Sequence, residues 1–147
     1  MTDFIAMIYE WFGYHSNLGT HLKGWDELCT GFIGTDLYLQ VFLIMVFVNL
    51  GLFILMYLII DKFTSKFSSK ASWWMTAAIA AALNFGIAYT IPGTVPACED
   101  LHFGAGDLML FGIANACWSL VVFALLTSFP FPRNFSTNAR LTTFWKP

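Results

Sequence analysis

The pattern of polar and apolar positions is dominated by a long uncharged stretch, residues 37–60, which reads LYLQVFLIMVFVNLGLFILMYLII. A helix rises about 1.5 Å per residue, so about 20 apolar residues cross a hydrocarbon core of roughly 30 Å. Two further uncharged runs follow at residues 73–91 and 108–129, and proline-containing turns close both of them. We therefore predict an all-α integral membrane protein with three transmembrane helices, which forms a single membrane domain over residues 1–147.

The amino-terminal segment, residues 1–36, has a different pattern. Apolar residues recur at three- and four-residue intervals within residues 1–13, while the acids Asp3 and Glu10 fall elsewhere on the helical wheel. This spacing predicts an N-terminal amphipathic interfacial helix, whose apolar face lies on lipid or on a partner protein. Residues 14–36 are expected to form an ordered loop with one helical turn at residues 25–29.

Charged residues are separated by sign along the chain, and this separation predicts the orientation of the spans. The basic loop 61–72 and the basic tail 130–147 hold all but one of the seven lysines and arginines. The amino-terminal segment and the acidic loop 92–107 hold all but one of the nine acids. Because lysine and arginine are enriched in cytoplasmic loops, we predict an outside amino terminus and a carboxyl terminus in the cytoplasm or matrix. The corresponding location is a bacterial or mitochondrial inner membrane.

Each predicted span contains one asparagine near its middle: Asn49, Asn84 and Asn115. An amide in hydrocarbon needs a hydrogen-bond partner, so these side chains are expected to face other helices. They form interhelical hydrogen bonds, line a small pathway or an ion or quinone site, or contact a partner subunit. The spans hold no Asp, Glu, Lys, Arg or His, which disfavours proton relays and active transport.

Small residues at four-residue intervals predict where the helices pack. Ala78, Ala82 and Gly86 form such a stripe in the second span, and Gly112 and Ala116 form a matching pair in the third. Small residues at this spacing allow two helix backbones to approach closely. We therefore predict a tight contact between the second and third spans.

Three further sets of residues are candidate sites. Cys29 and Cys98 fall in the same predicted compartment and form either a disulfide or two free thiols. Lys62, Lys66 and Lys70 are expected to reach lipid headgroups at the inner interface. His15, His21 and His102 are weak candidates for a metal site, because their spacing matches no tight ligand motif, and otherwise they are solvated loop residues.

The sequence shows no nucleophile–base pair, phosphate loop or paired catalytic carboxylates. The leading hypothesis is a non-catalytic accessory or scaffold subunit of a larger membrane complex, such as an energy-converting one. The first alternative is a self-assembling pore or channel protomer, because three spans in this orientation resemble the topology of phage-type holins, although the long amino-terminal segment departs from it. The second alternative is a membrane anchor associated with quinone or haem. No cofactor is predicted, structural lipids are expected, and the expected partners are other membrane subunits, copies of the chain itself and phospholipid, with no nucleic acid.

Overall fold

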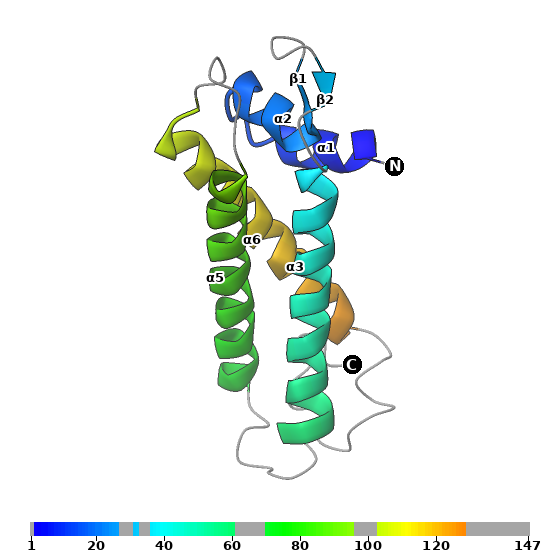
Figure 1. Ribbon diagram of the computed structural model, residues 1–147. Coiled ribbons are helices and arrows are strands. Elements are labelled where there is room, and N and C mark those ends of the chain that lie inside the picture. Colours follow the sequence, from blue (N-terminus) through cyan, green and yellow to red (C-terminus); the bar gives the residue numbers. More distant parts are fainter. Residues whose placement is uncertain (1, 27–30, 33–35, 61–69, 96–102, 129–147) are drawn as a thin grey trace.

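Three long helices form the body of the protein (Figure 1). The computed structural model describes residues 2–26, 31–32, 36–60, 70–95 and 103–128. Helix α3 (Leu37–Ile54) continues into the π-helical segment η1 (Leu55–Ile60), and it is followed by α5 (Lys70–Thr94) and α6 (Ala105–Ser128). The three helices contact one another, α5 and α6 most extensively, and α6 crosses the other two obliquely.

The described residues contain three helices that are long and apolar enough to cross a membrane. The first, Leu37–Ile60, has the predicted bounds, and the others run from Ala71 to Thr94 and from Ala105 to Ser128. The second continues through Pro92 for two more residues instead of ending before it. The third starts earlier than predicted, because the Asp107 carboxylate accepts a hydrogen bond from the Gly104 N–H at 3.0 Å and caps the first turn.

The amino-terminal residues form a cap across one end of the bundle, which we define as α1 (Thr2–Glu10) and α2 (Ser16–Lys23) with the turn that joins them (Figure 1). Two short strands follow, β1 (Trp25–Asp26) and β2 (Gly31–Phe32), and they pair antiparallel. The expected loop at residues 14–36 is therefore wrong over α2, and residues 25–26 are strand instead of helix. Gly24, with a φ of 71°, ends α2 in the left-handed conformation that favours glycine.

The apolar core has two parts. At the cap end, Leu18 and Leu22 of α2 and Tyr9 of α1 are buried against Tyr38 of α3 and Phe111 of α6. At the opposite end, which we call the far end, aromatic side chains dominate the contacts between the three helices. The buried members there are Phe53, Met56, Tyr57, Trp73, Ala77 and Phe123.

The contact between α5 and α6 uses only part of the predicted set of small residues. A Cβ atom added at Gly112 would lie 2.9 Å from the Phe85 ring and 3.3 Å from its carbonyl oxygen, so Gly112 allows a close approach there. Ala116 is half-buried, whereas Ala78 and Ala82 are exposed and a Cβ added at Gly86 would meet nothing within 4 Å. The predicted stripe on α5 therefore does not form the contact with α6.

The position of Asn84 explains why the stripe faces away from α6. Successive residues on a helix are about 100° apart, so residues two positions apart point to nearly opposite sides. Burying Asn84 inside the bundle turns Ala82 and Gly86 outward. The face of α5 that packs inside carries Ala77, Ala80 and Ala88 instead, each at most 1% exposed.

Candidate functional site

A connected set of buried polar side chains crosses the interior of the bundle. Asn49, Asn84 and Asn115 come from α3, α5 and α6, and all three are 0% exposed. Ser119 Oγ lies at their centre, because it accepts hydrogen bonds from Asn49 Nδ2 at 3.0 Å and from Asn84 Nδ2 at 2.8 Å. Asn115 Nδ2 donates to the Asn84 carbonyl oxygen at 2.7 Å. The amides therefore cross-link the three helices to one another within one chain.

The buried network extends into the cap through Tyr9. Its hydroxyl group donates a 2.6 Å hydrogen bond to Asn115 Oδ1, and its ring lies against Phe111 with 5.3 Å between the ring centroids. Tyr9 is 1% exposed, although it belongs to a helix outside the predicted spans. Because an unpartnered buried hydroxyl is costly, this bond fixes α1 relative to α6.

Two histidines of the cap contact the ends of the long helices. His21 is 4% exposed, and its Nε2 atom lies 3.1 Å from the carbonyl oxygen of Pro92 in α5. The His15 backbone N–H donates to Asp107 Oδ1 of α6 at 3.1 Å, while its Nδ1 atom caps α2 by accepting from the Asn17 N–H at 3.3 Å. The expected alternative to a metal site was a solvated loop residue, but His15 and His21 both contact a long helix. The third candidate, His102, lies outside the described residues.

The third long helix is bound to the cap through a pair of tyrosines. The hydroxyl groups of Tyr14, in the turn before α2, and Tyr38, in the first turn of α3, are hydrogen-bonded to each other. Tyr38 also donates a longer bond, 3.4 Å, to Glu10 Oε1. The cap thus has a side-chain or backbone contact with each of α3, α5 and α6.

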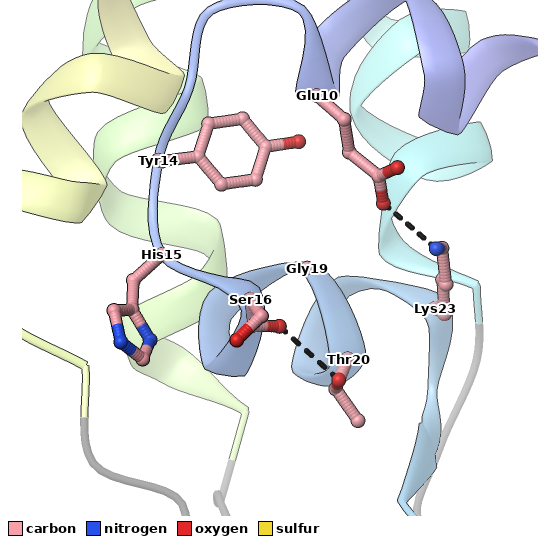
Figure 2. Close-up of a pocket in the computed structure, with 7 residues that line it drawn as sticks. All are labelled: Glu10, Tyr14, His15, Ser16, Gly19, Thr20 and Lys23. Atoms are coloured by element: carbon pink, nitrogen blue, oxygen red, sulfur yellow. Dashed lines mark hydrogen bonds and ion pairs between the residues drawn. The ribbon is translucent and has the colours of Figure 1, made fainter.

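A pocket of about 340 Å³ opens between α1 and α2 (Figure 2). Its charged groups are Glu10 and Lys23, whose Oε1 and Nζ atoms lie 2.7 Å apart. The remaining walls are polar or aromatic, and the complete lining is Glu10, Tyr14, His15, Ser16, Gly19, Thr20 and Lys23. The pocket thus combines one anion, one cation, hydroxyl groups and an aromatic ring.

Burial keeps the phenols of the cap protonated. It is the main cause that raises the pKa of Tyr9 above its ordinary value, with the charge of a neighbouring Tyr14 phenolate as a smaller cause. Burial likewise raises the pKa of Tyr14, while the bond to Tyr38 lowers it and the negative charge of Glu10 raises it. Both hydroxyl groups therefore stay protonated well above neutral pH.

Several predicted site residues lie where the structure does not describe them. The cysteines of the predicted disulfide, Cys29 and Cys98, and the lysines Lys62 and Lys66 are outside the described residues, and only the backbone is described at Lys70. Cys117 is an exposed free thiol on α6. Within the described ranges, no three His, Cys, Asp or Glu side chains are grouped so that they could hold a metal ion.

Ser119, Tyr9 and the pocket were not predicted from the sequence. Ser119 follows Asn115 by one helical turn, a spacing that places both on one face of α6 and that the sequence does contain. The polar residues of α2, spaced to form one helix face, were another usable signal. By contrast, the bond between Tyr9 and Asn115 joins positions 106 residues apart, and no local pattern indicates it.

Comparison with known proteins finds no match for this chain among protein-family models, curated proteins or solved structures.

Proposed function

We propose that the chain is a non-catalytic scaffold subunit of a larger membrane complex, with the cap on the outer side and the carboxyl terminus in the cytoplasm or matrix. The observation that carries the proposal is the attachment of the cap to all three long helices. Tyr38 of α3, Pro92 of α5, and Asn115 and Asp107 of α6 each contact a cap residue. A bundle tied together in this way presents its surfaces in a constant geometry, which suits a structural role.

The outer faces of the bundle support lateral docking to lipid and other membrane proteins. Large apolar side chains point outward from every long helix, among them Phe47 at 67% exposed and Leu125 at 68%. The three amides point inward and bond to partners in the same chain. A pore assembled from copies of the chain needs polar groups along the outer faces to line it. The exposed polar residues Gln40, Thr90 and Thr94 lie only at the cap end of α3 and α5, so this arrangement favours the scaffold over the pore.

The first helix supports placement of the cap in the outer interface of the membrane. Because Tyr9 reaches Asn115, which lies about 15 Å along α6 from Ala105, α1 lies beside the end of α6 and not beyond it. Phe4 and Met7 of α1 and Trp11, the residue after it, are exposed, the last at 84%. Indole rings favour the headgroup region, where one side is apolar and the other wet.

Purification of the tagged full chain from its native membrane in mild detergent, followed by native mass spectrometry, tests the proposal. The expected result is a particle of defined stoichiometry that contains this chain and other proteins. A closed ring made only of identical copies would contradict the scaffold and support the pore.

Photo-crosslinking identifies the surfaces involved. A photoreactive residue at Phe47 or Leu125 is expected to crosslink to a neighbouring protein of that particle. The same residue at Phe123, an aromatic position that is 0% exposed, serves as the control and is expected to give crosslinks within the chain only. Crosslinks from Phe47 and Leu125 to lipid alone would contradict lateral docking through these faces.

A further inference from the structure

The pocket of the cap is lined by the polar face of α2. Ser16, Gly19, Thr20 and Lys23 recur at three- and four-residue spacing, which places them on one side of the helix. The other side, with Leu18 and Leu22, is fully buried against the bundle. Because that apolar side fixes the orientation of the helix, the polar side faces the pocket, as Figure 2 shows.

The two charged groups of the pocket are already paired with each other. Lys23 and Glu10 retain 47% and 40% of their side-chain exposure, so the ion pair between them is strongly solvated. Such a pair contributes little to stability and is readily opened by a competing ligand. A ligand with a single charge would pair with only Glu10 or only Lys23 and would leave the other side chain unpaired. A zwitterion pairs with both side chains.

Two further residues give the pocket a fixed shape. Tyr14 is 9% exposed and its hydroxyl group is bonded to Tyr38, which holds its ring as a rigid wall. A Cβ atom added at Gly19 would lie 3.3 Å from Glu10 Oε1 and 3.5 Å from the Tyr38 hydroxyl oxygen. The missing side chain at position 19 therefore leaves room for the Glu10 carboxylate at the pocket wall.

We propose that this pocket binds a phosphoethanolamine-type zwitterion, with the ammonium group on Glu10 and the face of Tyr14 and the phosphate group on Lys23, Ser16 and Thr20. A carboxylate beside an aromatic ring binds a primary ammonium through charge-assisted hydrogen bonds and a cation–π contact. Lys23 and the Ser16 hydroxyl group supply donors for phosphate oxygens. The Thr20 hydroxyl group, which donates to the Ser16 carbonyl oxygen at 3.1 Å, joins them by rotating out of that bond. The net charge of the phosphodiester headgroup, like that of the Glu10–Lys23 pair, is zero, whereas the free monoester phosphoethanolamine carries close to one additional negative charge at pH 7.

The same chemistry is supplied by the headgroup of phosphatidylethanolamine or by a small soluble molecule. Tyr38 belongs to the first turn of a membrane-spanning helix and touches both Tyr14 and Glu10, so the pocket lies at the level where that helix enters the membrane. The lipid source thus rests on the membrane placement in the proposed function. The binding chemistry rests on the pocket alone and is independent of the scaffold role.

Isothermal titration calorimetry of the detergent-solubilised full chain with free phosphoethanolamine tests the chemistry. Binding is expected, and Glu10→Gln and Lys23→Gln should each weaken it about tenfold or more, because each removes a charge-assisted contact. Phosphocholine should bind more weakly, since its trimethylated nitrogen has no N–H to donate to Glu10. Asp3→Asn, which removes an acid outside the pocket, is the matched control and should bind like the parent chain.

A second variant keeps the test valid if a charge variant fails to fold. Thr20→Val preserves shape and helix packing but removes a hydroxyl group, and it should weaken phosphoethanolamine binding severalfold with unchanged circular dichroism. Inorganic phosphate that binds as tightly as phosphoethanolamine would overturn the proposal, as would equal binding by all variants or the absence of binding to both free and lipid headgroups.

Nanodiscs distinguish the two sources of the zwitterion. Native mass spectrometry of the chain released from discs that contain equal amounts of phosphatidylethanolamine, phosphatidylcholine and phosphatidylglycerol should show retention of phosphatidylethanolamine, and its loss in Lys23→Gln. Retention of the lipid supports a lipid headgroup site, and binding of free phosphoethanolamine without lipid retention supports a soluble zwitterion. Preferential retention of phosphatidylglycerol would contradict zwitterion recognition.

Discussion

The cap end and the far end of the bundle are held together by different kinds of interaction. At the cap end, hydrogen bonds from Tyr9, Tyr14, His15 and His21 connect elements distant in sequence. At the far end, the contacts are mostly aromatic, with Trp73 and Phe123 rings 5.6 Å apart between centroids, and a hydrogen bond of 2.9 Å runs from Trp73 Nε1 to Thr127 Oγ1. Directional bonds specify one arrangement, whereas in the proposed membrane setting apolar contacts have no solvent-derived driving force. The hydrogen bonds at the cap end therefore specify how the three long helices are arranged relative to one another.

The largest expected effect comes from removing the amide that joins the cap to the bundle. Asn115→Leu removes the bonds to Tyr9 and to the Asn84 carbonyl oxygen and leaves the Tyr9 hydroxyl buried without its acceptor. We expect a loss of about 2–3 kcal/mol in the free energy of unfolding. Thr127→Val at the far end breaks one buried interhelical bond, against two for Asn115→Leu, and should cost about 1 kcal/mol. Unfolding in a denaturing detergent measures both, and equal losses would contradict the difference between the two ends.

The second effect concerns the close contact of α5 and α6. Gly112→Ala forces the new Cβ atom against the Phe85 ring at 2.9 Å and should destabilise the bundle by about 2 kcal/mol. Gly86→Ala places the same group in open space and should be neutral or stabilise the helix by up to about 1 kcal/mol. Thermal unfolding in detergent compares the two variants. A loss at Gly86 as large as the loss at Gly112 would restore the stripe predicted from the sequence.

The smallest effect concerns the phenols of the cap. Folding raises the pKa of Tyr14 above its ordinary value of about 10, so folding favours the neutral phenol. The resulting stabilisation is present below about pH 10 and is lost as the pH rises through the folded-state pKa. Tyrosinate absorbance during a pH titration of the parent chain and of Tyr14→Phe isolates this group. If the absorbance difference between the parent chain and Tyr14→Phe appears at or below about pH 10, the pKa of Tyr14 is not raised by folding.

The three long apolar helices and the inward direction of their amides were predictable, because both follow from the cost of polar groups in apolar surroundings. That cost indicates that Asn49, Asn84 and Asn115 face the interior, but it does not identify Ser119 or Tyr9 as their partners. The partners depend on how the helices cross, which no local pattern encodes. The way the helices cross also decides which side of α5 is buried. The four-residue spacing of Ala78, Ala82 and Gly86 places them on one side of α5, but it does not indicate whether that side faces α6.

Helix α2 was missed for a different reason. Its sequence, SNLGTHLK, contains residues with weak helix propensity, and a helix of 8 residues is unstable in isolation. It forms because Leu18 and Leu22 are buried against the bundle, and because His15 caps its amino end and Gly24 its carboxyl end. Since the pocket is built on this helix, the pocket could not be predicted without it.

A double-mutant cycle between Tyr9→Phe and Asn115→Leu tests most directly whether the cap and the bundle are one unit. The free energy of unfolding of the parent chain, both single variants and the double variant gives the coupling energy between the two side chains. We predict a coupling of about 1 kcal/mol or more, because the Phe variant removes the hydroxyl that Asn115→Leu leaves unpartnered. Additive losses, with a coupling near zero, would contradict the account.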